Sequence, residues 1–116
     1  SIMNIAEEIA ILASAAKTRK LKISHLKGAS FTISSLGAIG GKFFTPIINP
    51  PEVGILGLSK TFAKVVAKNE EFESREFLPL SLSYDHRAIN GVYAAQFVTQ
   101  LGFALEDTAL MEKNFK

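Results

Sequence analysis

The sequence predicts an α+β fold on the basis of three features of its hydrophobic pattern. The chain begins with a segment of helical apolar spacing, continues through several strand-like segments, and ends on a second helical pattern. This order of helix, strand, loop, strands and helix is typical of helices layered on a sheet. A chain of 116 residues, 47% of them hydrophobic, can build one such domain around a single core.

Two predicted helices stand at the ends of the chain. In residues 2–17 the apolar side chains recur three and four residues apart, which places them on one helix face. That face consists of Ile2, Ile5, Ile9, Leu12 and Ala16. The same spacing predicts a second helix over residues 91–111. Its predicted buried side consists of Val92, Ala95, Val98, Leu101 and Leu105.

The predicted strands lie between these helices. In residues 30–36, "SFTISSL", alternation places Thr32 and Ser34 on one face and Ser35 on the other. Glycines at 37–41 end this strand. In residues 77–85 the alternation separates an apolar face from a polar one: Leu80, Leu82 and Tyr84 on the first, and Ser81, Ser83 and Asp85 on the second.

The middle of the chain is expected to contain a loop and a hairpin. Residues 42–52 include three prolines, which exclude a helix and predict a stiff, extended loop. Residues 53–67 are strand-like, and their glycines indicate that something packs closely against them. Residues 68–76 are expected to form the polar turn at a hairpin tip.

Composition and charge exclude several classes of protein. A net charge of +2, from 13 basic and 11 acidic residues, is too balanced to indicate nucleic-acid binding. The absence of cysteine excludes disulfides and thiolate metal sites and is consistent with a reducing compartment. No apolar run approaches the roughly 20 residues that span a bilayer. The two histidines, His25 and His86, lie in no metal-ligand pattern.

The segment that can carry chemistry is "SLSYDHRAING", residues 81–91. His86 follows an alternating strand and precedes a helix, a position where a side chain is held rigidly yet stays accessible. Histidine is the side chain that ordinarily acts as base and acid around neutrality. His86 is therefore the candidate general base, whereas His25 is interpreted as a surface residue.

Each candidate in this segment also has a structural interpretation. A histidine at a strand end can be purely structural, and Asp85 and Arg87 can form a surface ion pair worth about 0–1 kcal/mol. Asn90, just before Gly91, can be the N-cap of the last helix. The spacing H-x-x-x-N is too short to be specific, and by itself it favours these structural interpretations.

Longer motifs point to a family. "DHRAING" resembles the signature D-H-R-x-x-[DN]-G of the dihydrolipoamide acyltransferases, the core component of 2-oxo acid dehydrogenase complexes. "FTISSLG" and "FTPIINPPEVGILG" are similar to further blocks of that family, in the same order and spacing. The resemblance runs from about Ala13 to about Val98. The second block, together with Asn90, favours the acetyl-transferring, pyruvate-type branch.

The resemblance implies a role for each candidate. His86 corresponds to the general base that takes the proton from the thiol of coenzyme A or dihydrolipoamide, so that the thiolate attacks the thioester of the other partner. Ser34 corresponds to the serine whose hydroxyl stabilises the oxyanion, with Ser35 as second choice. Asn90 stands where most members have Asp; it cannot carry a negative charge and is expected to position by hydrogen bonding.

Three further positions are assigned more coarsely. Asp85 and Arg87 are expected to shape the strand end beside His86. Phe44 matches a family position near the substrate channel, with a place in the core as the equal alternative.

The resemblance further implies a fold like that of chloramphenicol acetyltransferase, a mixed sheet packed with helices. The expected assembly is a homotrimer with its active sites between subunits, and trimers build a larger core. Coenzyme A is expected as substrate, and the lipoyl group as cargo on a separate lipoyl domain. The other expected partners are the dehydrogenase components, with no metal, nucleic acid or membrane.

The chain is about half as long as the family's catalytic domain. Residues 1–116 are therefore expected to be the C-terminal part of that domain, with no lipoyl or subunit-binding domain, and the activity of this part alone stays open. Two alternatives remain: a structural core subunit without transfer activity, and an acyltransferase for a small amine or alcohol, which "SYDHR" and "NPPE" disfavour. The expected location is the bacterial cytoplasm or, in a eukaryote, the mitochondrial matrix.

Overall fold

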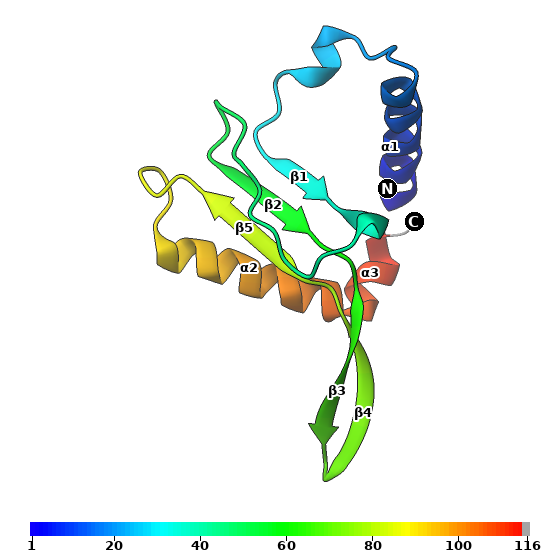
Figure 1. The fold of residues 1–116 in the computed structure, drawn as a ribbon, viewed down its shortest axis with the longest axis vertical. Helices are drawn as coiled ribbons and strands as arrows, with labels where there is room; N and C mark the ends of the chain where they lie inside the picture. Colours follow the sequence, from blue (N-terminus) through cyan, green and yellow to red (C-terminus); the bar gives the residue numbers. More distant parts are fainter. Residues whose placement is uncertain (115–116) are drawn as a thin grey trace. The chain divides into compact units, whose positions relative to one another are not determined.

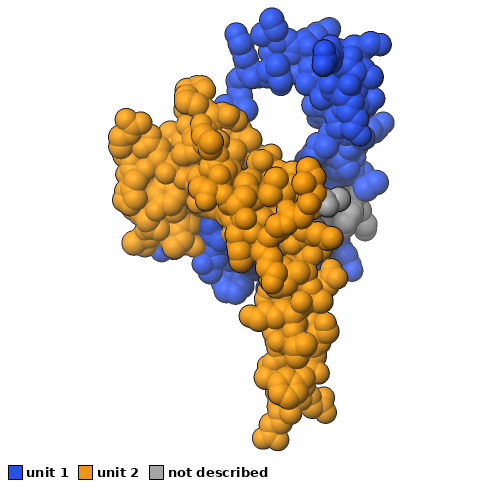
Figure 2. Space-filling view, viewed as in Figure 1, with its two compact units in different colours: residues 1–29, 96–116 blue, residues 30–95 orange. Residues whose placement is uncertain are grey.

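The computed structural model describes residues 1–114 and has its helices and strands in the predicted order (Figure 1). The chain divides into two compact units, one of residues 1–29 with those from 96 onward, the other of residues 30–95 (Figure 2). Every candidate site residue belongs to the second unit. Within residues 1–114 no helix has the length and apolar character that a membrane crossing requires.

A three-stranded mixed sheet forms the centre of the second unit, with strand order β1-β2-β5. β1 (Thr32–Ser35) runs parallel to β2 (Gly54–Leu58), and β5 (Leu80–Tyr84) runs antiparallel to β2 (Figure 1). β1 and β5 are therefore the two edge strands. The predicted mixed sheet is confirmed.

The two faces of this sheet differ in chemistry, as the alternation predicted. One face, here called the hydroxyl face, carries the polar side chains of both edge strands: Thr32, Ser34, Ser81 and Ser83. The other face carries apolar side chains of β2 and β5. Ile55 and Leu56, on opposite faces of β2, are only 4% and 5% exposed, so the central strand is the core of this unit.

β3 (Phe62–Lys68) and β4 (Glu71–Phe77) form a separate antiparallel hairpin that extends from the end of the sheet (Figure 1). The rings of Phe62 and Phe77 stack at its base, with their centroids 6.1 Å apart. One face of the hairpin carries exposed apolar side chains, because Val65 is 64% and Phe72 is 81% exposed to solvent.

The predicted limits of these strands were wrong in two places. The strand-like segment 53–67 is two strands of different sheets, interrupted after Leu58. The predicted turn 68–76 is mostly strand, because the turn itself needs only Asn69 and Glu70. Their φ angles of 52° and 67° are the left-handed conformations that let two residues close a hairpin tightly.

α1 (Ile2–Lys17) has the predicted bounds, and the hydroxyl of Ser1 caps it by accepting a hydrogen bond from the N–H of Asn4 at 3.3 Å. None of its residues is buried, and Ile5 and Ile9 on its apolar face are 59% and 61% exposed. An open apolar face of this kind is typical of a surface that contacts a further chain or segment.

Two helices, α2 (Gly91–Glu106) and α3 (Thr108–Asn114), replace the single helix predicted for residues 91–111. Asp107 separates them, because its Oδ1 accepts a hydrogen bond from the N–H of Leu110 at 3.0 Å and so caps a new helix.

The predicted buried side of the final helix was also wrong in part. Val92, Ala95 and Leu105 are exposed, and the buried residue of α2 is Ala94, at 5% exposure. The less exposed residues of α2 include Ala94, Val98 and Leu101. Apolar spacing alone could not distinguish Ala94 from its apolar neighbours as the buried residue.

The proline-rich loop before β2 lacks regular structure, as predicted, and packs on the hydroxyl face. A Cβ added at Gly57 would lie 2.8 Å from Cζ of Phe44 and 3.3 Å from Cγ of Pro46. A side chain at Gly57 would overlap the ring of Phe44, so the close packing predicted for the glycines of residues 53–67 is confirmed at this position.

Gly57→Ala is expected to lower the free energy of unfolding by about 1–3 kcal/mol, because the added methyl group overlaps the ring of Phe44. Urea denaturation followed by circular dichroism measures the difference. Gly102→Ala in α2 is the matched control: a Cβ there meets no atom within 4 Å, so stability should rise by up to about 1 kcal/mol. A Gly57→Ala protein as stable as its parent would show that Phe44 does not occupy this space.

Candidate active site

His86 lies in the turn that joins β5 to α2, and backbone hydrogen bonds fix this turn. The N–H of Asp85 donates to the Val53 carbonyl at 2.9 Å, and the N–H groups of Ala88 and Ile89 donate to the Asp85 carbonyl at 3.0 and 2.9 Å. The side chain of His86 is exposed. Its backbone is therefore held in place while its imidazole stays accessible, which is the geometry predicted for a general base.

The imidazole of His86 lies beside an aromatic ring and the first residue of α2. The Tyr84 and His86 ring centroids are 5.6 Å apart, with the planes tilted by 40°. A Cβ added at Gly91 would lie 3.4 Å from Oη of Tyr84 and 3.8 Å from Nε2 of His86. Both distances are ordinary van der Waals contacts, so the start of α2 lies directly beside the two rings. Sequence reasoning missed Tyr84 as a neighbour of the site, although its place two residues before His86 was a usable signal.

Asn90 is the N-cap of α2. The N–H of Tyr93 donates to its Oδ1 at 2.8 Å, and the N–H of Ala94 donates to its carbonyl at 3.1 Å. The structural interpretation of Asn90 is therefore confirmed. The cap uses Oδ1 as an acceptor, and the NH₂ group of the same amide can act only as a donor.

Asp85 and Arg87 form an ion pair on the outer side of the same turn. Nη2 of Arg87 lies 2.7 Å from Oδ2 of Asp85, and the backbone N–H of Arg87 donates to Oδ1 at 2.9 Å. The side-chain and backbone hydrogen bonds from Arg87 lower the pKa of Asp85 from 3.8 to about 2, and the pKa of Arg87 is raised. The pair lies directly after β5 and holds the carboxyl of Asp85 in its charged form at neutral pH.

Ser34 is half-buried on the hydroxyl face, whereas Ser35 is exposed on the other face of β1. The register places Ser34 opposite Gly57, and Gly57 opposite Ser81. The ring of Phe44 covers the middle of this row. The structure therefore separates the two serine candidates by face, as the alternation predicted.

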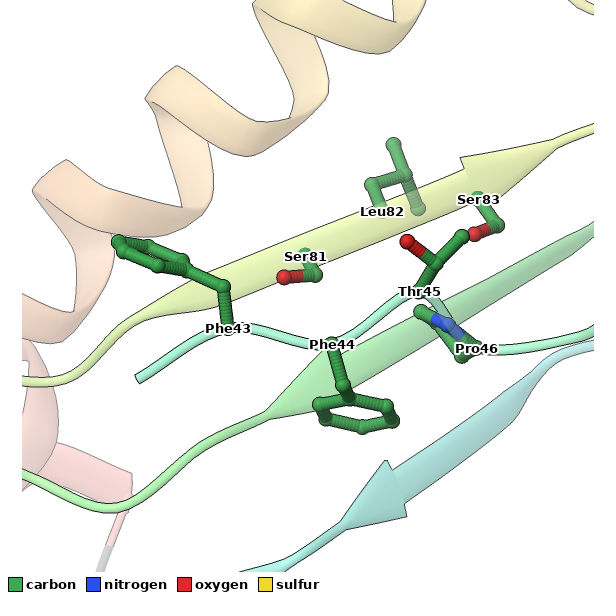
Figure 3. Close-up of a pocket in the computed structure, with 7 residues that line it drawn as sticks. All are labelled: Phe43, Phe44, Thr45, Pro46, Ser81, Leu82 and Ser83. Atoms are coloured by element: carbon green, nitrogen blue, oxygen red, sulfur yellow. The ribbon is translucent and has the colours of Figure 1, made fainter. Parts of the chain in front are cut away.

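Phe44 also borders a cleft of about 300 Å³ between the proline-rich loop and β5 (Figure 3). The lining residues are Phe43, Phe44, Thr45, Pro46, Ser81, Leu82 and Ser83. The rings of Phe43 and Phe44 point to opposite sides of the loop (Figure 3). Phe44 is half-buried: its ring packs on β2 at Gly57, and it also lines this cleft.

A second cleft, of about 380 Å³, lies beside the turn that carries His86. Its walls combine the apolar proline-rich segment with three charged side chains. The lining residues are Ile48, Pro50, Pro51, Glu52, Val53, Asp85 and Arg87. Among residues 1–114, no three His, Cys, Asp or Glu side chains gather in a way that could hold a metal ion.

Glu52 makes a side-chain contact that sequence reasoning missed. The hydroxyl of Thr32 donates to Oε2 of Glu52 at 2.6 Å, and Nδ2 of Asn49 donates to the same hydroxyl at 3.4 Å. The available signal was a carboxylate directly after two prolines, the one acidic side chain in residues 42–52.

The sheet register keeps Ser34 and His86 apart within one chain. Ser34 is level with Ser81, which lies on β5, two strands away from β1. Asp85 comes directly after β5 and follows Ser81 by four residues. At about 3.3 Å per residue and about 4.8 Å per strand, the backbone of Ser34 lies about 16 Å from the strand end before His86. A general base must come within about 3 Å of the proton it takes, and the two backbone positions are much farther apart than that.

Residues 1–112 match the family described as 2-oxoacid dehydrogenases acyltransferase (catalytic domain). The chain belongs to this family. It is 53% identical, over 107 residues, to the dihydrolipoyllysine-residue acetyltransferase component of the pyruvate dehydrogenase complex of Azotobacter vinelandii, which covers 92% of this chain and 17% of that protein. The same component of Buchnera aphidicola subsp. Acyrthosiphon pisum is 51% identical over 107 residues, covering 92% of this chain and 27% of that protein.

Solved acyltransferase cores have the same fold. Dihydrolipoamide acetyltransferase of A. vinelandii, studied for the role of a serine, a histidine and an asparagine in its catalytic mechanism, superposes with a TM-score of 0.89 at 51% identity. The cubic core of a pyruvate dehydrogenase multienzyme complex superposes with a TM-score of 0.90 at 52% identity. Each comparison covers 96% of this chain and 46% of the solved chain. The predicted family and core fold are confirmed, and the chain spans just under half of these solved chains.

Arg87→Gln is expected to raise the pKa of Asp85 from about 2 toward 3.8, because it removes the guanidinium and leaves only the backbone N–H as donor. Since the folded-state pKa is the lowered one, the stabilisation from this pair is complete above about pH 4 and is lost as the pH falls toward 2. NMR titration of the Asp85 carboxyl measures the pKa. Lys68→Gln, which removes a partner of Glu73 in the hairpin, should leave it unchanged. A value near 3.8 in the parent protein would contradict the assignment.

Proposed function

We propose that this chain transfers an acyl group, in the first instance acetyl, between dihydrolipoamide and coenzyme A. The observation that carries the proposal is that the spacing of three residues along the sequence matches that of a studied relative. The serine and histidine studied in the A. vinelandii acetyltransferase stand 52 residues apart, and its asparagine follows the histidine by four. Ser34, His86 and Asn90 repeat both intervals in a chain of the same family.

His86 acts as the general base in the proposed reaction. Its imidazole takes the proton of the attacking thiol as the new carbon–sulfur bond forms, and returns that proton to the thiolate that leaves when the tetrahedral intermediate collapses. The fixed turn and the exposed ring support this role. A positioned base of this kind contributes about 10²–10⁴ in rate.

Ser34 stabilises the oxyanion of the tetrahedral intermediate with its hydroxyl, a contribution of about 10²–10³ in rate for one well-placed donor. Its half-buried position on the hydroxyl face supports this role, since a donor is stronger away from bulk water. Asn90 holds the start of α2 through its cap, and its NH₂ group is the donor by which it would position a reacting group. No metal enters the proposed reaction.

We propose that each active site combines residues of two copies of the chain. The distance of about 16 Å between the Ser34 and His86 positions supports this, because the two groups must meet at one thioester carbonyl. The apolar side chains exposed on the hairpin and on α1 provide surface that an assembly can cover. A homotrimer that builds a larger core is the assembly we propose.

The wider setting also stays a proposal. We infer that residues 1–116 form the C-terminal part of the catalytic domain and that coenzyme A is a substrate. The lipoyl group would arrive on a separate lipoyl domain, charged by the dehydrogenase components of a pyruvate dehydrogenase complex. Bacterial cytoplasm or mitochondrial matrix is the proposed location.

A structural core subunit without transfer activity is the alternative function. The exposed apolar surface favours it, because a scaffold needs surface for assembly and no catalytic groups. The two functions differ in the expected effect of replacing His86. A scaffold would keep its assembly and has no transfer activity to lose, whereas an acyltransferase would keep its assembly and lose turnover.

His86→Ala is expected to lower acetyl transfer from acetyl-coenzyme A to dihydrolipoamide at least a hundredfold while the assembly stays intact. The assay compares the parent and variant in the natural polypeptide that carries this sequence. His25→Ala is the matched control and should retain parental activity, because His25 lies outside the proposed site. Equal turnover by His86→Ala and the parent would exclude His86 as the base, and an inactive but assembled parent would support the scaffold.

Mixing Ser34→Ala chains with His86→Ala chains is expected to restore activity that neither variant has alone. If each site takes Ser34 from one copy and His86 from another, random co-assembly leaves about one site in four with both residues. The measurement is the transfer rate of the co-expressed variants. It is compared with the transfer rate of the two variants assembled separately and mixed just before the assay. Failure of co-assembled variants to regain activity would place both residues of each site in the same copy.

A further inference from the structure

We propose that Glu52 is a positioning residue for acyl transfer: its carboxylate holds the hydroxyl of Thr32 and thereby fixes the strand that carries Ser34. This inference rests on the proposed function of Ser34.

The contact between Glu52 and Thr32 is short and partly buried. The Thr32 hydroxyl lies 2.6 Å from Oε2 of Glu52, within the range of hydrogen bonds to an ionised acceptor. The same hydroxyl accepts a hydrogen bond from Nδ2 of Asn49 at 3.4 Å. Thr32 is therefore held from both ends of the turn that contains the two prolines.

Thr32 belongs to an edge strand of the sheet. β1 is four residues long, and the structure pairs it on one side only, with β2. A short edge strand depends on side-chain contacts to keep its position. Thr32 and Ser34 are two residues apart on the same face, so a shift at Thr32 is passed directly to the Ser34 hydroxyl.

Glu52 is suited to this task because its own backbone is constrained. Two prolines with fixed φ precede it, and its N–H donates to the Asn49 carbonyl at 2.9 Å. The next residue, Val53, accepts the hydrogen bond from Asp85 that anchors the turn of His86. One rigid segment therefore touches both the strand of Ser34 and the turn of His86.

This arrangement predicts a defined kinetic effect. An oxyanion donor works only if it lies about 2.7–3.1 Å from the developing charge, and small misplacements are costly. Loss of the carboxylate removes the acceptor of the Thr32 hydroxyl and frees β1 to move. The loss should lower kcat and leave the KM for both thiol substrates nearly unchanged, because Glu52 acts through Ser34 and not on the ground-state complex.

The test is a set of substitutions in the natural, assembled polypeptide that carries this sequence. Glu52→Ala and Thr32→Val are each expected to lower kcat about ten- to a hundredfold. Thr32→Ser keeps the hydroxyl and should stay near the parental kcat. Glu70→Gln, at the hairpin turn, is the control for loss of an exposed carboxylate and should have no effect.

The deciding comparison places Glu52→Ala in a Ser34→Ala background. If Glu52 acts through Ser34, the double variant is no slower than Ser34→Ala alone, whereas a general loss of folded enzyme would slow it further. Hydrogen exchange of residues 30–36 gives a readout apart from turnover, and Glu52→Ala should speed it about tenfold or more. Parental kcat in Glu52→Ala, additive losses in the double variant, or unchanged exchange would each overturn the proposal.

The same experiment separates this proposal from the proposed function. If the parent transfers acetyl groups and His86→Ala does not, while Glu52→Ala equals the parent, only the role of Glu52 fails. If the parent and His86→Ala do not differ, the proposed function fails and the role of Glu52 fails with it.

Discussion

The backbone register of the β1-β2-β5 sheet is the constraint on which the rest of the site depends. It places Ser34 level with Gly57 and Ser81, and it places the turn of His86 beyond the far end of β5. Side chains can rotate, but a hydrogen-bonded ladder cannot slip by several residues without exposing Ile55 and Leu56. The separation of the serine from the histidine is therefore a property of the fold, and the site shared between two copies is our proposal for how the chemistry accommodates it.

The segment from Asn49 to Val53 is the second organising element. Its side chains tie β1 through Thr32, while its backbone ties the turn after β5 through Asp85. Further back in the same loop, Phe44 closes over Gly57 in the middle of the hydroxyl face. The proline-rich loop thus covers the middle of the hydroxyl face, and its stiffness holds β1 and the turn of His86 in a constant relation.

The sequence was a good guide where local rules decide the outcome. Alternation correctly assigned Ser34 and Ser35 to opposite faces, and cap chemistry correctly made Asn90 the start of α2. It failed where tertiary contacts decide: apolar spacing could not choose Ala94 over Ala95 as the buried position, and a polar run at 68–76 concealed a strand behind a two-residue turn. Glu52 was missed because its partner is 20 residues away, a distance that no local pattern spans.

Cross-linking tests most directly whether the site is shared between copies. The chain contains no cysteine, so Ser34→Cys and His86→Cys introduced together are its sole thiols. A short bis-maleimide applied to the assembled double variant should join position 34 of one copy to position 86 of another and give multi-chain products on a denaturing gel. Peptide mass spectrometry identifies the linked positions, and the two single variants should not give the 34–86 link. A link between positions 34 and 86 within one chain, with no multi-chain product, would contradict the account.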